Sequence, residues 1–233
     1  MTLAGRGARL VLADIDSVTV SEVAEQVGGL PVLADVSTEQ GVEHLHSTAM
    51  SYLGHVDLYC ANAGVATEGG PDTDDALWQR TWEINTMAHV RAARLLLPGW
   101  LERGEGRFLA TVSAAGLLMS LGSAPYSVTK HAALAFAEWL RATYLHRGVV
   151  VQALCPQGVA TPMLQSAGQA AQLLLSAEAL TADEVADQVV RALDGEEFLI
   201  LPHPQVTDYC VARATDPDRW LSGMNRLQQR IET

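Results

Sequence analysis

The sequence predicts a single α/β domain built on a parallel β-sheet. Short apolar runs alternate with helical patterns along the chain, which is typical of parallel β/α architecture. The 233 residues are 48% hydrophobic, which is enough for one domain with a sizeable core. No internal repeat or low-complexity linker divides the chain, so we expect one domain over residues 1–233.

The predicted elements follow one another in β/α order. Strands are predicted where short apolar runs lie between turn residues, at Arg9–Ala13, Leu30–Ala34, Val56–Ala61, Arg107–Val112, Val149–Leu154 and Phe198–Leu201. Helices are predicted where apolar residues recur at helical spacing, at Ser17–Val27, Thr38–Leu53, Asp75–Glu102, Tyr126–His146 and Ala182–Leu193.

The composition limits the functions to consider. A formal charge of −12 argues against nucleic acid and anionic membrane partners, because both need a basic surface. No apolar stretch reaches the roughly 20 residues that span a bilayer, and nothing after Met1 marks export. The three widely spaced cysteines, Cys60, Cys155 and Cys210, are interpreted as packing thiols, not metal ligands. We therefore expect a cytoplasmic protein without a metal site.

Lys130 is the only lysine among 15 basic residues, and it lies four residues after Tyr126. On a helix these positions share a face, so the phenol and the ammonium can point into one cleft. The compact ammonium would favour the phenolate and lower the pKa of the tyrosine. The pair predicts a general acid/base, and a solvent-facing lysine beside a helical tyrosine is the alternative for so short a motif.

Further polar positions precede Tyr126 in a regular order. Ser113 lies thirteen residues before it, at the carboxyl end of a predicted strand, where open α/β sheets bind ligands. Asn85 lies within a predicted helix, and Asn62-Ala63-Gly64 follows another predicted strand. Taken singly, Ser113 could cap a turn and Asn85 could be a satisfied polar group of its helix. Together they form an ordered set that favours a site.

This set resembles the motifs of the short-chain dehydrogenase/reductases, a family of single-domain enzymes. The resemblance runs from about Leu3 to about Leu201, which divides the chain into a motif-bearing core, residues 1–201, and a C-terminal extension, residues 202–233. It implies a Rossmann-like, doubly wound parallel sheet and hydride transfer between a nicotinamide nucleotide and a carbonyl or secondary alcohol. Pro156–Thr161 resembles the family's carboxamide-binding loop, with Gln157 in place of the usual glycine.

The resemblance implies a role for each matching residue. Tyr126 would exchange a proton with the substrate, and Ser113 would hydrogen-bond the reacting oxygen. Lys130 would lower the pKa of Tyr126 and hold the nicotinamide ribose, and Asn85 would place a water in the proton relay. The implied cofactor contacts are Asp14, Asp35, Val36, Asn62, Ala63, Gly64, Tyr126, Lys130, Pro156, Val159 and Thr161.

Asp14 bears on the choice of cofactor. It follows the predicted strand Arg9–Ala13, where an acidic side chain would hydrogen-bond the adenine ribose and repel a 2′-phosphate. NAD is therefore favoured over NADP. Alternatively, Asp14 merely begins a turn into the next helix, and Asp16 could take its place. The pair Asp35-Val36 resembles the pair that family members place against the adenine.

One family feature is absent from the sequence. Members begin with a strand and a turn of the form Thr-Gly-x-x-x-Gly-x-Gly, which lets the pyrophosphate approach the next helix. Here residues 1–7 are interpreted as the last turn of that helix, followed directly by the strand at Leu10. The absent strand would be central in a 3-2-1-4-5-6 sheet, so the strands at Leu10 and Leu58 would lack a partner unless they pair directly. NAD binding is therefore in doubt.

Two explanations of this gap remain open. The sequence is either a shortened version of a longer polypeptide or a variant without the phosphate cradle. We favour the shortened version, because locally inconsistent elements argue against a foldable whole.

The predicted substrate is a small, neutral, apolar alcohol or ketone. The positions expected to line its pocket carry no basic residue and are Ala114, Leu117, Leu118, Met119, Met163 and Leu164. The segment Pro162–Leu180 is either a mobile substrate lid or a surface helix with one apolar face. His203, between two prolines, is interpreted as structural and not as a substrate contact. The resemblance also implies a homodimer or homotetramer, with the C-terminal extension packed against a neighbouring subunit.

Two function classes follow. The first is an NAD(H)-dependent oxidoreductase. The alternative is a protein of the same fold without dinucleotide chemistry, either a cofactor-free lyase or cyclase that uses Ser113, Tyr126 and Lys130, or a catalytically silent assembly partner.

Overall fold

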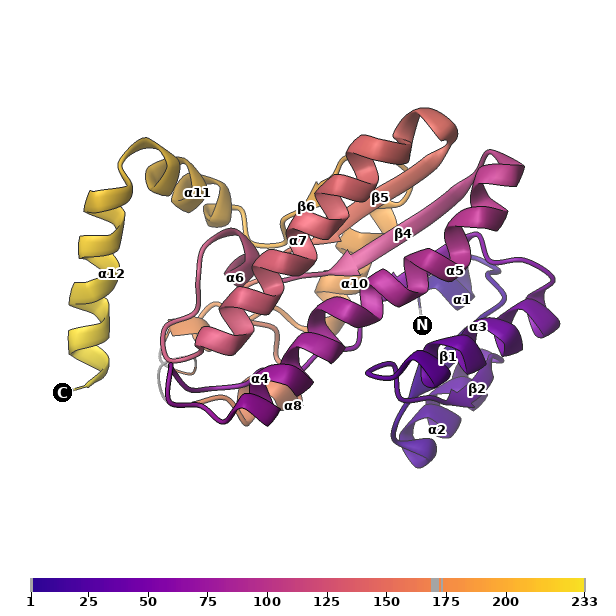
Figure 1. Cartoon of the computed structure of the whole chain (residues 1–233), viewed down its shortest axis with the longest axis horizontal. Coiled ribbons are helices and arrows are strands. Elements are labelled where there is room, and N and C mark those ends of the chain that lie inside the picture. The colour runs from indigo at the N-terminus through magenta and orange to yellow at the C-terminus, as the bar shows by residue number, and fades with distance from the viewer. Residues whose placement is uncertain (1, 169–171, 173, 233) are drawn as a thin grey trace.

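A computed structural model describes residues 2–168, 172 and 174–232, and its strands all run parallel (Figure 1). They form a two-stranded sheet of β1 and β2 and a four-stranded sheet in the order β3-β4-β5-β6. The strands are β1 Val11–Asp14, β2 Leu30–Leu33, β3 Leu58–Ala61, β4 Gly106–Thr111, β5 Val149–Leu154 and β6 Leu199–Ile200. All six predicted strands are present, and the prediction of a Rossmann-like α/β fold is confirmed.

The long helices also follow the prediction. They are α2 Ser17–Val27, α3 Glu39–Leu53, α7 Ala124–Tyr144 and α10 Ala182–Ala192. Local signals set several of their ends. The Asp16 carboxylate accepts hydrogen bonds from Val18 N and Thr19 N at the start of α2, and Thr181 and Glu184 form a capping box at the start of α10.

The predicted helix Asp75–Glu102 is divided. It consists of α4 Asp75–Trp82, a π-helical stretch η1 Glu83–Met87 and α5 Ala88–Arg103. Asn85 lies in the middle of η1. A π-turn inserts a residue into the helix and re-aims side chains, often at functional sites. Apolar periodicity alone could not reveal such a local insertion.

Several short or terminal helices were not predicted as elements. They are α6 Ala114–Leu117, α8 Pro162–Gln165, α11 Gln205–Thr215 and α12 Pro217–Ile231, whereas α1 Thr2–Gly5 agrees with the helical turn expected before β1. Figure 1 shows α11 and α12 at one end of the molecule, far from α2. None of the helices that the structure describes is both long and apolar enough to cross a bilayer.

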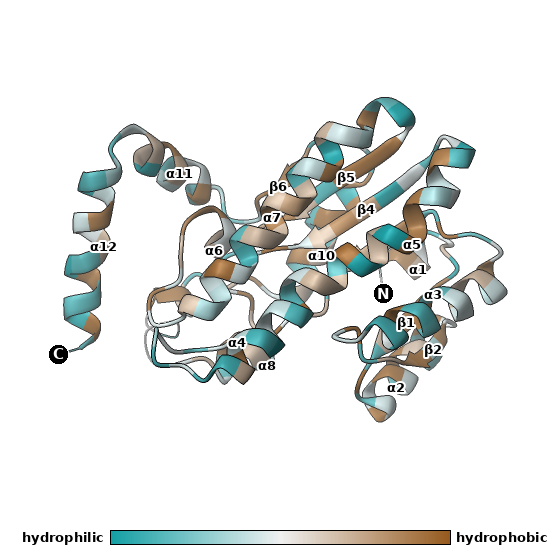
Figure 2. Cartoon of the chain, viewed as in Figure 1, coloured by the Kyte–Doolittle hydropathy of each residue, from teal (hydrophilic) through white to brown (hydrophobic). Residues whose placement is uncertain are grey.

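The main core lies between the four-stranded sheet and the helices α5 and α7, which cover one face of it (Figure 1). All six residues of β5 are buried, and Figure 2 shows this strand as largely hydrophobic. Trp100 is 1% exposed, and its Nε1 donates to Val56 O over 2.6 Å. A methyl group at Gly106 would come within 2.2 Å of the Trp100 ring, so only glycine fits at the start of β4.

β1 and β3 do not pair, so the direct pairing considered from the sequence does not occur. The two sheets are joined instead through α3, whose Val42 and Ala49 share a core cluster with Ala92 and Leu96 of α5. The Arg91 guanidinium also donates to Ser37 O over 3.0 Å. Helix packing can hold the two parts together, but it provides no partners for backbone groups on the facing strand edges.

A cavity of about 1010 Å³ lies between these edges and is lined by residues of β1, β3, α3 and α5. It occupies the place where the sequence analysis expected a central strand to be absent. Cys60 of β3 lines the cavity and is exposed, so its interpretation as a packing thiol is wrong. The reason is that β3 has no neighbour on this side to cover it. Cys155, on the covered side of the sheet, is buried as expected.

Candidate active site

Ser113 follows β4 at the carboxyl end of the four-stranded sheet. Its Oγ accepts a hydrogen bond from Ala115 N over 3.1 Å and so caps α6, as the alternative interpretation allowed. The same Oγ lies 3.5 Å from Pro156 O, in the loop after β5. The hydroxyl therefore stands between the ends of two neighbouring parallel strands, where α/β sheets bind ligands.

Tyr126 and Lys130 lie one turn apart on α7, and both point toward this end of the sheet. The side chain of Lys130 is buried, with 3% of the residue exposed, and its Nζ donates to Thr111 O over 2.9 Å. The distance from Nζ to the centroid of the Tyr126 ring is 5.7 Å. Lys130 is therefore not the solvent-facing lysine of the alternative interpretation.

Asn85 joins three segments at the same place. It is fully buried, its Oδ1 accepts from Val65 N over 2.9 Å, and its Nδ2 donates to Val65 O over 2.9 Å and to Thr129 Oγ1 over 3.1 Å. A methyl group at Gly64 would lie 3.4 Å from both Asn85 Oδ1 and Lys130 Nζ. The glycine of Asn62-Ala63-Gly64 thus lets the loop after β3 pass directly over the lysine.

Burial governs the protonation of the acid/base pair. It raises the pKa of the Tyr126 phenol, although a hydrogen bond with Ser113 acts in the opposite direction. Burial also lowers the pKa of the Lys130 ammonium to about 8. The spacing of Tyr126 and Lys130 predicts a lowered pKa for the tyrosine, and in this structure the net direction is the opposite. The sequence revealed the neighbouring cation but not the burial of the pair.

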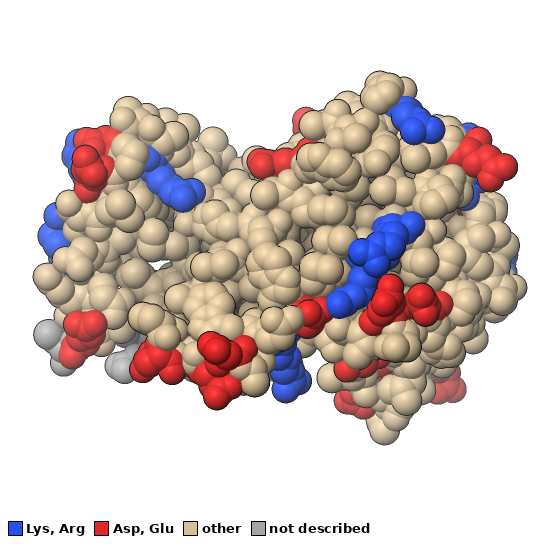
Figure 3. All heavy atoms as spheres, viewed as in Figure 1, with Lys and Arg blue, Asp and Glu red and all other residues tan. Residues whose placement is uncertain are grey.

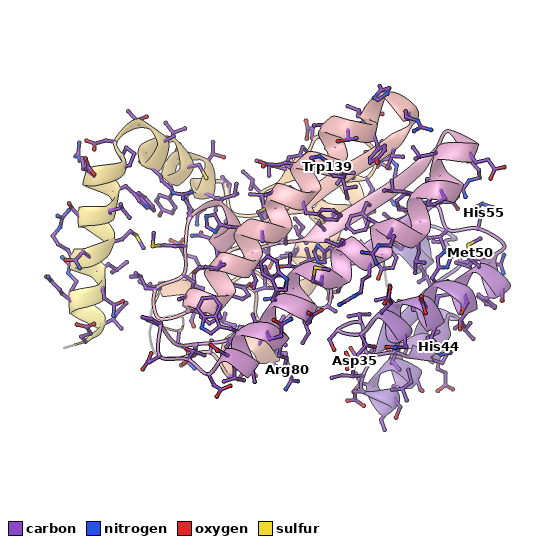
Figure 4. All side chains as sticks on the ribbon, in the orientation of Figure 1. Asp35, His44, Met50, His55, Arg80 and Trp139 are labelled. Atoms are coloured by element: carbon purple, nitrogen blue, oxygen red, sulfur yellow. The ribbon has the colours of Figure 1, made fainter. Side chains whose placement is uncertain are left out.

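The residues predicted to bind the adenosine end line the cavity between the sheets. They are Asp14, Asp35 and Val36, and Asn62, Ala63 and Gly64 line the same cavity further along. Figure 4 shows Asp35 on the β1–β2 side of the molecule and Arg80, another lining residue, on the α4 side. Asp16 is engaged as the cap of α2, and its hydrogen bonds with Thr19 and Val18 lower its pKa. Asp14 Oδ1 accepts from Asp16 N over 3.0 Å, as its alternative role in the turn implies, but Asp14 lines the cavity and Asp16 does not, so Asp14 is the better candidate for a ribose contact.

The predicted carboxamide loop is anchored beside Ser113 and does not line the cavity. Pro156 O accepts from Ala114 N over 2.8 Å. Leu180 N donates to Gly158 O over 3.1 Å, and Ala160 N donates to Leu180 O over 2.8 Å. Val159 and Thr161 are thus held near the end of β5, whereas Asp14 and Asp35 belong to the two-stranded side.

These residues fit a nicotinamide nucleotide at its two ends only. Polar groups suited to the nicotinamide end surround Lys130, and carboxylates suited to the adenosine end follow β1 and β2. In the described part of the chain, no glycine-rich turn leads from a strand into a helix beside the cavity. The residues that the structure describes contain no cluster of three or more histidine, cysteine or carboxylate side chains suited to a metal ion.

His89 is a buried polar residue of the cavity that the sequence analysis missed. It is 1% exposed, it lines the cavity, and neither ring nitrogen has a hydrogen-bond partner. Burial, and to a smaller extent the charge of Lys130, lowers its pKa to about 3. Its position four residues after Asn85 on one helical stretch was a signal that could have placed it near the site.

The predicted substrate wall is partly covered by the C-terminal extension. Ala114 and Leu118 are buried in a cluster with Val206 of α11, and Leu117 and Trp220 pack against it. They were expected to line the substrate pocket; in the structure α11 packs against them, and they do not line the cavity between the sheets. Met163 does line the cavity and is 41% exposed. The lid proposed over Pro162–Leu180 falls partly on residues 169–171 and 173, which lie outside the described residues.

Comparison with known proteins agrees with this architecture. The family model described as short chain dehydrogenase matches residues 1–172. The 1-deoxy-11-beta-hydroxypentalenate dehydrogenase of Streptomyces exfoliatus is 36% identical over 208 residues, 83% of this chain and 74% of that protein. The 2-keto-3-deoxy-L-fuconate dehydrogenase of Xanthomonas campestris is 29% identical over 180 residues, 75% of this chain and 57% of that protein.

Solved structures of short-chain dehydrogenases also superpose well on this chain. A short-chain dehydrogenase/reductase from Burkholderia phymatum, in complex with NAD, superposes with a TM-score of 0.85 and 25% identity over 92% of this chain and 87% of that one. A short-chain dehydrogenase from Sphingobium yanoikuyae, in complex with NADPH, has a TM-score of 0.81 and 24% identity over 95% and 88% of the two chains.

Proposed function

The chain belongs to the short-chain dehydrogenase family of oxidoreductases, and we propose that it interconverts a small apolar secondary alcohol and the matching ketone with NAD(H). The observation that carries this proposal is the meeting of Ser113, Tyr126, Lys130 and Asn85 at the carboxyl end of the four-stranded sheet. A dehydrogenation needs one group to move a proton at the substrate oxygen and another to hold that oxygen, and this end of the sheet supplies both.

In the proposed reaction, Tyr126 Oη and Ser113 Oγ hold the substrate oxygen. When an alcohol is oxidised, Tyr126 first loses its proton, the phenolate takes the hydroxyl proton of the substrate, and the carbon becomes a carbonyl carbon; in reduction the neutral phenol gives its proton to the carbonyl oxygen. The nicotinamide ring supplies the acceptor or donor of the hydride when it is bound. The reaction balances as alcohol plus NAD⁺ giving ketone, NADH and one proton.

Lys130 provides a route for that proton. Its pKa of about 8 lies close to neutrality, so the ammonium can lose its proton to solvent. The neutral amine can then take the proton that the buried phenol would otherwise retain. The hydrogen bonds of Asn85 to Val65 and Thr129 hold the surrounding segments in place. We propose that Asn85 orders the end of this relay and takes no part in bond making.

We propose NAD as the preferred cofactor. Asp14 would accept hydrogen bonds from the adenine ribose, Asp35 and Val36 would contact the adenine, and Lys130 would hold the nicotinamide ribose. Pro156, Val159 and Thr161 would hold the carboxamide. Support comes from the placement of Asp14 on the cavity wall and from the engagement of Asp16 in helix capping. Between these two proposed groups of contacts, the described residues that line the cavity include the basic side chain of Arg80.

We also propose assembly into a homodimer or homotetramer. The outer side of α7 carries large apolar residues: Trp139 is 54% exposed, Val128 is 49% exposed, and Trp139 contacts Phe136 and Tyr144. Figure 4 shows Trp139 on this outer side. Exposed apolar surface of this kind favours a protein partner. On the face in Figure 3, a short strip of basic side chains lies beside acidic ones, and other acidic side chains are scattered along the lower edge.

Titration of the 233-residue chain with NADH and with NADPH by calorimetry tests the cofactor proposal. Saturable NADH binding with weaker NADPH binding supports it. The second function class is a protein of the same fold without dinucleotide chemistry. Absence of binding, both by this chain and by a version that carries a strand and glycine-rich turn ahead of Thr2, would favour that second class.

A further inference from the structure

The loop after β5 is held by a hydrogen-bond series that begins in the sheet. Along the β5–β6 ladder, Ala153 N donates to Phe198 O over 2.7 Å and Cys155 N donates to Ile200 O over 2.9 Å. The series advances two residues at a time, so its next donor is Gln157 N. The acceptor there is not a carbonyl oxygen but the side chain of His203, whose Nδ1 lies 3.1 Å away.

The sequence around His203 explains this exchange. Pro202 and Pro204 flank it, and proline fixes φ and offers no N–H for a ladder, so β6 cannot continue. The main chain instead turns into α11, and His203 O accepts from Val206 N over 3.1 Å. With the residue only 3% exposed, the ring is held in place, and its Nδ1 adds one more step to the series after the strands diverge.

Gln205 makes a second connection to the same loop. Its Nε2 donates to Gln157 Oε1 over 2.9 Å and to Glu178 Oε2 over 2.8 Å. Glu178 lies just before Leu180, which already bonds Gly158 and Ala160. The main chain and the side chain of Gln157 are thus both held by the segment that starts the C-terminal extension. We call His203 and Gln205 the C-terminal clasp.

We propose that the C-terminal clasp positions the Pro156–Thr161 loop for nucleotide binding, with His203 as the principal positioning residue. The inference rests on the proposed function, in which this loop holds the nicotinamide carboxamide. It gives the C-terminal extension a role in the active site of its own chain. It also gives Gln157, which departs from the family pattern, a structural purpose, because a glycine there could not accept from Gln205.

The chemistry of the ring suggests matched variants. Since Nδ1 accepts the Gln157 amide hydrogen, a neutral His203 carries its proton on Nε2, which is buried and has no hydrogen-bond partner among the described residues. Asparagine places an acceptor oxygen close to the position of Nδ1, whereas leucine fills the site without an acceptor. His203→Asn and His203→Leu therefore differ chiefly in the hydrogen bond to Gln157. His146→Leu, at an exposed histidine, serves as the control for loss of an imidazole.

The test combines a structural and a functional measurement. Hydrogen exchange resolved at single amides should show the Gln157 amide exchanging about fivefold faster in His203→Leu, the worth of one ordinary hydrogen bond, and recovering within about twofold in His203→Asn. The KM for NAD should rise by a similar factor in His203→Leu, with kcat nearly unchanged, and should return toward the wild-type value in His203→Asn. His146→Leu should alter neither quantity.

Equal exchange rates of the Gln157 amide in the wild type and both His203 variants would overturn the proposal. So would a KM for NAD in His203→Leu that matches the wild type while the amide exchanges faster. If the wild-type chain binds no nucleotide, the proposed function fails for this chain, and the same variants are then compared in a version with a strand and glycine-rich turn ahead of Thr2. Loss of amide protection without any change in nucleotide affinity in that version would leave His203 a structural residue only.

Discussion

The two sheets of this molecule differ in what lies against their strands. Every residue of β5 is buried between β4 and β6, whereas β1 and β3 each have one paired side and one side that faces the cavity. We call the four-stranded sheet with its helices the covered side, and the two-stranded sheet with the cavity wall the open side. The covered side carries Tyr126, Lys130, Ser113 and Asn85. The residues proposed to bind adenosine, Asp14 among them, belong to the open side.

Two buried ionisable residues, Lys130 and His89, differ in whether their polar atoms have hydrogen-bond partners. Lys130 is 3% exposed and donates to Thr111 O, so its burial is partly compensated by a hydrogen bond. His89 is 1% exposed and has no partner for either ring nitrogen. An unpaired buried polar group costs free energy that a paired one does not. His203 Nε2 and Trp220 Nε1, away from the cavity, are also buried without a partner among the described residues, but in His89 both ring nitrogens are left unpaired.

The largest expected effect tests the covered side. Tyr126→Phe should lower turnover by about 10²- to 10⁴-fold, the usual worth of general acid/base catalysis, because only the proton-transferring hydroxyl is removed. Steady-state kinetics with a saturating alcohol or ketone would measure the loss, and circular dichroism would check the fold. Tyr144→Phe, at the other end of the same helix, should keep full activity. A Tyr126→Phe variant with more than about a tenth of the wild-type rate would exclude Tyr126 from the role.

The next prediction tests the open side by adding a strand and a glycine-rich, phosphate-binding turn. A segment with a strand and a Gly-x-x-x-Gly-x-Gly turn ahead of Thr2 should fill the cavity and tighten NADH binding by about a hundredfold or more, because backbone N–H groups would then bond the pyrophosphate. Calorimetric titration of both forms measures the change. The same segment with its glycines replaced by valine is the control and should bind no better than the 233-residue chain. Micromolar NADH affinity of the 233-residue chain would contradict the prediction.

The same contrast separates what the sequence could predict from what it could not. Apolar periodicity located all six strands, and the order of Ser113, Tyr126 and Lys130 indicated one site, because both signals are local or tied to strand ends. The π-turn at Asn85, the burial that sets the pKa of Tyr126 and the contact between His203 and Gln157 arise from packing between distant segments. No spacing along the chain encodes them.

Lys130→Arg tests whether the covered site tolerates a larger cation. Nζ is a buried point donor to Thr111 O, and the broad, planar guanidinium does not match that place. We expect turnover to fall by about ten- to a hundredfold, within the range assigned to proton-transfer groups. The pH–rate profile should also show a higher apparent pKa for the acid/base group, because arginine cannot release a proton as a lysine with a pKa of about 8 can. An active variant with an unshifted profile would remove the special role of lysine.

His89→Leu tests the cost of an unpaired group on the open side. It should raise the free energy of unfolding at neutral pH by about 1–3 kcal/mol, the cost of unsatisfied buried polar atoms. The pKa of His89 is lowered from 6.5 to about 3, so below pH 6.5 the unfolded chain takes up a proton that the folded chain does not. Stability of the wild type should therefore fall as the pH falls from about 6.5 toward 3, and less so in the variant. Urea unfolding at several pH values measures this, and parallel curves would contradict it.

The smallest expected effect concerns cofactor choice, and it depends on whether the open side forms an adenosine site at all. Asp14 ends β1 on the cavity wall, where its carboxylate can accept from a ribose and repel a 2′-phosphate. Asp14→Ala removes both interactions, so the ratio of NADP to NAD efficiency, each as kcat/KM, should rise by about five- to tenfold, the worth of one charged hydrogen bond at an exposed position. Asp16→Ala is the matched control: it should lower stability through loss of the α2 cap but leave the ratio unchanged. A ratio that shifts in the Asp16 variant and not in the Asp14 variant would reverse the assignment. A ratio that shifts in neither would mean that the adenosine does not bind at the ends of β1 and β2, and the open side would then contribute nothing to nucleotide selection.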